Sequence, residues 1–142
     1  MPELELANVR KKSRIFDLLP WLNQNTATAI YPHVYVPMTM YEDLHQKSPD
    51  PYYIALVLHE QEHIKRAKTS GVFRFYVRYL LRRHFRFEEE LEAIKPQFHY
   101  LKKMGLDPYI EHRARYMSGW LYFWPVSYDT ALRKLQEIWD NC

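Results

Sequence analysis

Residues 50–63 read DPYYIALVLHEQEH, and they decide how the rest of the chain is interpreted. Asp50 is a favourable N-cap, and Pro51 suits the first position of an α-helix. The apolar run that follows is typical of a helix buried on most of its surface. Cations at 65, 66 and 68 and a glycine at 71 indicate the helix end. The sequence therefore predicts a buried helix from Pro51 to about Gly71.

The end of this stretch, residues 59–63, has the pattern H-E-x-x-H. Residues four apart lie on one helix face, so His59 and His63 can present two imidazole nitrogens to a single metal ion. Glu60 can then reach a metal-bound water as its general base. So short a motif also arises by chance, and its helical context is what favours a metal site.

A catalytic zinc site needs a third protein ligand and one open position. Arg66 and Thr69 stand where an extended motif would place a glycine and a third histidine, so that arrangement is excluded. Glutamates at 88, 89, 90 and 92 remain. Their segment has an apolar face formed by Phe87, Leu91, Ile94, Phe98 and Leu101.

Helical geometry selects one of these glutamates. At about 100° per residue, Glu90 lies roughly 60° from the centre of the apolar face. Glu88, Glu89 and Glu92 lie roughly 100° or more away, which suits solvent. We therefore expect Glu90 to point inward as the third ligand. The alternative is an ordinary ion pair between Glu90 and Arg86, four residues earlier.

The pattern His59-Glu60-x-x-His63, followed after a helical hairpin by Glu90-x-x-Ala93, resembles the gluzincins, which are zinc peptidases. The small size and the order of elements are most similar to the minigluzincins, over roughly residues 26–105. The resemblance implies that His59, His63 and Glu90 bind Zn²⁺ and that Glu60 is the catalytic base. Many relatives carry an aspartate that supports a ligand histidine one turn after the glutamate, where this chain has Ile94.

The expected fold class is α+β, mostly α, as a single small zincin-like domain over residues 1–142. An edge strand in a short sheet would suit binding of an extended peptide, although it equally suits a simple cover for the helices. The expected elements are an interrupted helix over 6–23, a strand over 26–37 held at the edge by Pro32, a loop or short helix over 38–50, and helices over 72–83, 87–104, after 107–108 and over 128–139.

Composition favours a cytoplasmic protein. Cys142 is the single cysteine, which excludes an internal disulfide, and no signal-peptide pattern or bilayer-spanning run is evident. A basic stripe at Arg74, Arg78, Arg82 and Arg86 could bind nucleic acid or an anionic membrane. The net charge of +3 is modest, so nucleic acid is not the expected partner and a solvated helix face is favoured.

Residues able to stabilise an oxyanion are His99, Tyr100, Tyr109, His112, Arg113, Arg115 and Tyr116, and sequence alone brings none of them to the metal. The aromatic segment 120–124 suits a core or a homo-oligomer contact. The favoured function is a zinc metallopeptidase acting on a peptide or protein substrate, kept latent if a neighbouring element such as the C-terminal aromatic segment plugs the cleft. The alternative is a helical interaction protein that binds metal without chemistry, or an anionic partner.

Overall fold

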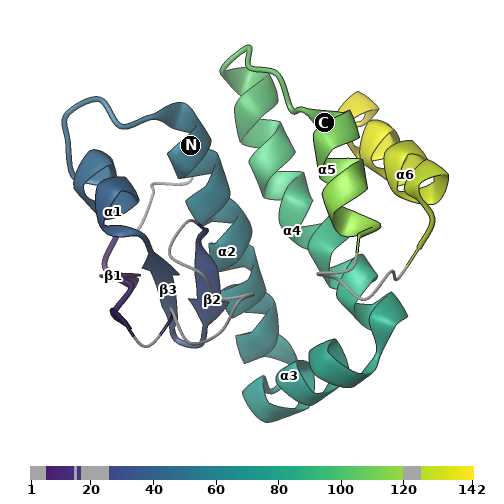
Figure 1. Ribbon diagram of the computed structural model, residues 1–142, viewed down its shortest axis with the longest axis horizontal. Coiled ribbons are helices and arrows are strands. Elements are labelled where there is room, and N and C mark those ends of the chain that lie inside the picture. Colours follow the sequence, from purple (N-terminus) through teal and green to yellow (C-terminus); the bar gives the residue numbers. More distant parts are fainter. Residues whose placement is uncertain (1–5, 15, 17–25, 120–125) are drawn as a thin grey trace.

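The computed structural model of the chain describes residues 6–14, 16, 26–119 and 126–142. Within them the fold is α+β and mostly α, with a three-stranded sheet beside a set of helices (Figure 1). The sheet has the order β1-β3-β2, in which β1 runs parallel to β3 and β2 runs antiparallel to it. The strands are β1 (Val9–Lys11), β2 (Thr28–Ile30) and β3 (His33–Val36).

The expected N-terminal helix is wrong where the structure describes it, because β1 lies there instead. The backbone N–H of Lys12 donates to the Val36 carbonyl at 2.9 Å, and that of Val34 donates to the Asn8 carbonyl at 3.0 Å. Pairing with a distant strand therefore overrides the local helical pattern, as is common for strands. The part of this prediction over residues 17–25 lies outside the described residues.

The single expected strand over 26–37 is two strands joined by a turn at Tyr31-Pro32. Pro32 lies in the turn, where its missing N–H interrupts no ladder. β2 is an edge strand, as expected of this segment, whereas β3 is central. Val34 and Val36 are fully buried, and burial of such side chains contributes roughly 1.5–3 kcal/mol each.

The motif helix begins where the sequence predicts. Asp50 accepts a hydrogen bond from the Tyr52 backbone N–H at 2.8 Å, as an N-cap does. Gly71 ends the helix with φ 90°, a conformation that side chains disfavour. The next two helices form the predicted hairpin, and the second continues through Pro96. The first four helices are α1 (Met38–Leu44), α2 (Pro51–Ser70), α3 (Val72–Leu81) and α4 (Arg83–Lys103).

The chain ends in α5 (Ile110–Met117) and α6 (Tyr128–Asp140). α5 begins two residues later than Asp107-Pro108 suggests, because Tyr109 is left-handed, with φ 50°. Ser127 caps α6 as predicted, accepting from the Thr130 N–H at 3.2 Å. Among the helices that the structure describes, none combines the length and apolar character that crossing a bilayer requires.

Helix α2 divides the core into two parts, with the sheet and α1 on one side and α4, α5 and α6 on the other (Figure 1). Val57 and Ile64 of α2 pack with the first part, and Ala55 packs with the second. The motif helix is therefore flanked on two sides, which explains its apolar sequence. This arrangement holds the H-E-x-x-H segment between the sheet and α4.

Candidate metal centre

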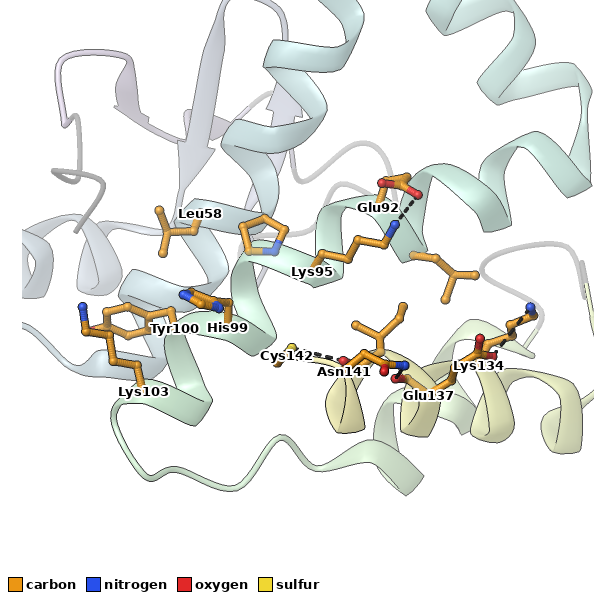
Figure 2. A pocket seen from close by; sticks show the side chains of 13 residues that line it. Leu58, Glu92, Lys95, His99, Tyr100, Lys103, Lys134, Glu137, Asn141 and Cys142 are labelled. Carbon is orange, nitrogen blue, oxygen red and sulfur yellow. Dashed lines mark hydrogen bonds and ion pairs between the residues drawn. The ribbon is translucent and has the colours of Figure 1, made fainter.

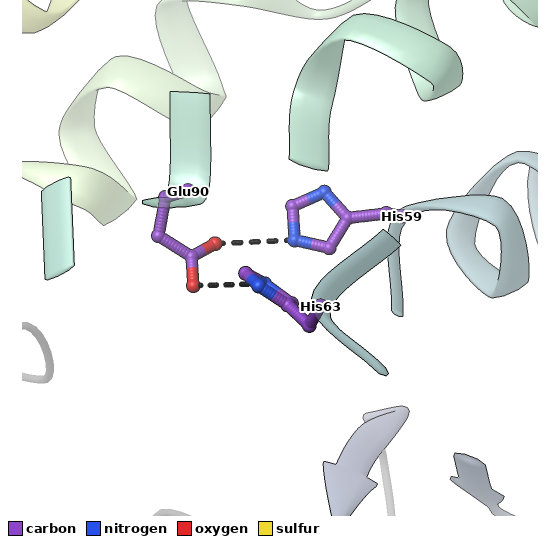
Figure 3. A group of neighbouring side chains, drawn as sticks. All are labelled: His59, His63 and Glu90. Atoms are coloured by element: carbon purple, nitrogen blue, oxygen red, sulfur yellow. Dashed lines mark hydrogen bonds and ion pairs between the residues drawn. The ribbon is translucent and has the colours of Figure 1, made fainter. Parts of the chain in front are cut away.

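His59 and His63 of α2 converge on Glu90 of α4 (Figure 3). The Nε2 atom of His59 lies 3.1 Å from Oε2 of Glu90, and Nε2 of His63 lies 3.1 Å from Oε1. All three side chains are buried. Glu90 therefore points inward, as the helical wheel predicts. It faces the two histidines and does not form the alternative ion pair with Arg86.

The donor atoms of these three residues all lie within 4.8 Å of one another, so the group could hold a metal ion. Ligands about 2.1 Å from a tetrahedral zinc ion are roughly 3.4 Å apart, which is close to the spacing seen here. Two imidazoles and one carboxylate are also a donor set that leaves one coordination position open. The three residues therefore fit a metal ion such as zinc in both donor chemistry and spacing.

Glu60 lies between this cluster and the edge strand. Burial raises its pKa above the ordinary carboxyl value, and the charge of Glu90 adds to that effect. The charges of His59 and His63 act in the opposite direction, together with a hydrogen bond to the backbone of Ala29 in β2. Glu60 is therefore a carboxyl group with raised proton affinity beside the candidate metal ligands.

Lys12, directly after β1, is a charged residue near Glu60 that the sequence did not single out. Only 8% of its surface is exposed. Burial lowers its pKa to about 8, although the nearby charge of Glu60 acts to raise it. Its ammonium lies over the Phe16 ring, 5.3 Å from the centroid. No sequence pattern predicts the approach of Lys12 to Glu60, because it depends on strand β1, which the sequence did not predict.

Tyr79 of α3 supports the carboxylate ligand. Its hydroxyl donates to Oε1 of Glu90 at 2.5 Å, the same oxygen that faces His63. Burial would raise the pKa of Glu90, but the charges and hydrogen bonds of both histidines hold it well below its usual range. Glu90 is thus ionised and is held in orientation by Tyr79 and the two histidines.

Gln97, seven residues after Glu90 on α4, supports the other side of the cluster. Its amide lies 3.0 Å from Nδ1 of His59. Both ends of the amide form hydrogen bonds when its NH₂ group donates to Nδ1 of His59. In this orientation its oxygen accepts from both terminal nitrogens of Arg113, each at 3.1 Å. Binding of a metal through Nε2 places the proton of His59 on Nδ1, so the amide must then present its oxygen to that atom.

This contact gives a prediction for Gln97. The Gln97→Leu variant should bind Zn²⁺ about 10- to 100-fold more weakly, since His59 loses the group that fixes its ring. The Gln97→Glu variant should match or exceed the wild type, because a carboxylate accepts from both His59 and Arg113. Competition with a chromogenic chelator measures both affinities. Equal affinity in all three proteins would show that Gln97 does not orient the ligand.

A larger part of helix α4 is buried than the helical wheel predicts. Glu89, expected in solvent, is only 5% exposed and makes a two-pronged contact with Arg66, at 2.6 and 2.8 Å. α4 packs against both α2 and α3, so its buried face is wider than contact with one helix allows. Arg86, expected in a solvated stripe, is also buried and donates to the Leu80 carbonyl at 2.9 Å.

Most of the oxyanion candidates lie elsewhere. His99 and Tyr100 line a cleft of about 780 Å³ between α4 and α6, and none of His59, His63 and Glu90 is among the described residues around it (Figure 2). Tyr109, His112 and Arg115 line a second cleft between α5 and α6. Tyr116 is near enough to the cluster for Glu90 and Glu60 to add to the effect of burial, which raises its pKa. The aromatic segment 120–124 lies outside the described residues.

No family model, no characterised protein and no solved structure matches this chain. The class of site is therefore defined by the residues themselves, as a buried His-His-Glu group that could hold a metal ion. Gln97 and Tyr79 are the supporting residues that the sequence interpretation missed. The seven-residue spacing between Glu90 and Gln97 puts both on one helix face and was a usable signal, whereas Tyr79 had none.

Proposed function

We propose that this chain is a zinc metallopeptidase of the minigluzincin type, with His59, His63 and Glu90 as metal ligands and Glu60 as general base. The observation that carries the proposal is the convergence of these three donors from two helices, with Glu60 beside them. The H-E-x-x-H motif alone arises by chance, but chance does not also place a buried carboxylate 3.1 Å from both imidazoles.

The proposed reaction is hydrolysis of a peptide bond. A bound zinc ion would polarise the scissile carbonyl and acidify a water molecule. The Glu60 carboxylate accepts the proton of that water as its oxygen adds to the carbonyl carbon. Glu60 then passes the proton to the amide nitrogen, and the carbon–nitrogen bond breaks to release an amine and a carboxylic acid, which ionises by losing its proton to solvent.

The edge strand beside the site supports binding of an extended substrate, and its contacts support a latent enzyme. A neighbouring strand pairs through alternate N–H and C=O groups along one edge. Here the Tyr76 hydroxyl accepts from the Tyr31 N–H at 2.9 Å and lies 3.5 Å from the Ala29 carbonyl. A peptide that adds to β2 must displace Tyr76 from both groups.

The test of the proposed function is zinc content followed by hydrolysis of a peptide library. We expect about one zinc ion per chain and slow cleavage, detected by mass spectrometry of the products. Tyr76→Phe should cleave faster than the wild type, because it cannot bind the strand edge through a hydroxyl. Zinc binding without cleavage by either protein would favour the alternative, a metal-binding protein without peptidase activity.

Zinc affinity should also depend on pH. Burial would lower the pKa of His63, but the charge and hydrogen bond of Glu90 raise it to about 9. A histidine must lose its proton to bind metal, so affinity should rise about tenfold per pH unit up to this value and then level off. Without metal, the stability of the fold changes with pH in the opposite direction. The stabilisation by protonated His63 is complete below pH 6.5 and is lost as the pH rises through about 9.

Titration calorimetry in buffers of different ionisation enthalpy measures this effect. At neutral pH the enthalpy should vary with the buffer as expected for release of one proton per zinc ion. An enthalpy that is the same in all buffers would mean that His63 is neutral before the metal binds.

A further inference from the structure

Helix α3 presents a row of apolar side chains to solvent. Phe73 is 83% exposed, Leu80 is 70% exposed and Leu81 is 77% exposed, and Val77 is exposed between them. Their spacing in the sequence places them on one face of the helix. Single exposed apolar residues are ordinary, whereas a continuous row marks an interaction surface. We call Phe73, Val77, Leu80 and Leu81 the apolar row.

The surroundings of the apolar row are positively charged. From His63 to Phe87 the sequence has no aspartate or glutamate. Arg74 on α3, Arg82 directly after this helix and Arg83 at the start of α4 are all exposed. The cations of this stretch are Lys65, Arg66, Lys68, Arg74, Arg78, Arg82, Arg83 and Arg86, of which Arg66 and Arg86 are engaged by Glu89 and by the Leu80 carbonyl.

The position of α3 leaves this surface open. The helix packs against α2 and α4 through its other face, on which Phe75 is buried. Figure 1 shows α3 at one end of the molecule, away from α6 and from the loop between α4 and α5. Within the described part of the chain, the apolar row is therefore exposed at one end of the molecule.

We propose that the apolar row of α3 docks on an anionic lipid bilayer, with the neighbouring arginines bound to lipid phosphates. A helix with apolar side chains on one face and arginines beside them lies in the plane of the membrane interface. The apolar side chains enter the headgroup boundary, and long arginine stems let guanidinium groups remain among the phosphates. This surface goes beyond the proposed peptidase activity and does not depend on it.

The charge and the apolar character of this surface argue against two other binding partners, a second copy of the chain and a nucleic acid. A second copy of the chain, packed row against row, would bring the arginines of both copies together, and like charges oppose that contact. A nucleic acid would neutralise the arginines but leave the aliphatic side chains in water. An anionic bilayer satisfies both the charge and the apolar surface.

Sedimentation with lipid vesicles tests the proposal, using the metal-free full chain. The vesicles contain phosphatidylcholine alone or with added phosphatidylserine. Leu80→Gln/Leu81→Gln removes apolar surface, and Arg74→Gln/Arg82→Gln removes charge. The matched controls are Met104→Gln, an exposed apolar residue after α4, and Arg115→Gln/Arg133→Gln, which removes two exposed arginines from α5 and α6. Circular dichroism checks that every variant is folded.

The wild type should sediment with phosphatidylserine vesicles and remain in solution with phosphatidylcholine alone. Each α3 double variant should bind on the order of tenfold more weakly, and the controls should bind as the wild type does. Three outcomes would overturn the proposal: no binding by the wild type, binding that survives loss of Leu80 and Leu81, or dimerisation that competes with the vesicles. Tighter binding to an oligonucleotide, unaffected by Leu80→Gln/Leu81→Gln, would instead assign the surface to nucleic acid.

Discussion

The Glu60→Gln variant should lose about 10²- to 10⁴-fold of the peptide hydrolysis rate while keeping its zinc ion. The amide has nearly the shape of the carboxyl group but cannot accept a proton from water. Glu60 is not among the three donors that could bind the metal, so the ligand set is unchanged. Loss of activity with full metal content is therefore the expected signature of a general base.

The measurement is cleavage of a peptide identified in the library screen, with zinc content determined on the same samples. Glu62→Gln is the matched control, two residues further along α2, where the carboxylate belongs to the surroundings of Arg66 rather than to the cluster. Activity retained in Glu60→Gln would assign the base to another residue. Equal losses in both variants would indicate damage to the helix rather than to the chemistry.

Glu90→Ala and His63→Ala should each weaken zinc binding by more than about 100-fold, which is the upper end of the effect of losing a ligand's hydrogen-bond partner. Each change removes a donor atom and leaves buried polar groups without their partner. In Glu90→Ala these groups are the two imidazoles, so the folded state should also lose roughly 1–3 kcal/mol for each group left unsatisfied.

Zinc content after dialysis and competition with a chelator measure this effect, and thermal unfolding reports the stability. Glu88→Ala is the matched control, because Glu88 lies on the exposed side of α4. Zinc retained in Glu90→Ala but lost in His63→Ala would mean that the motif is correct and the third ligand lies elsewhere. Zinc retained in both variants would refute the site.

The sequence predicted those parts of the centre that depend on one helix at a time. Asp50, Pro51 and the apolar run define α2, and the four-residue spacing of the histidines follows from helix geometry alone. Glu90 was identified because its own helix has a recognisable apolar face. Glu89 was misassigned because α4 packs against α2, α3 and α6, and a helical wheel drawn for one apolar face cannot show a second buried face.

The features that the sequence did not predict depend on contacts between segments that are distant in the chain. β1 is a three-residue strand whose backbone partner lies in β3, and nothing in its own sequence outweighs the helical pattern around it. Lys12 approaches Glu60 because of that strand, and Tyr79 reaches Glu90 because α3 folds back over α4. Local patterns carry no information about such pairings until the topology is known.

Helix α3 is tied to two separate parts of the site by two tyrosines. Tyr76 holds the open edge of β2, and Tyr79, less than one turn later, holds the carboxylate of Glu90. The apolar row lies on the outside of the same ten-residue helix. A rigid tilt of α3 would break both tyrosine contacts in one movement. A change in the position of α3 would therefore alter the edge of β2 and the surroundings of Glu90 at the same time.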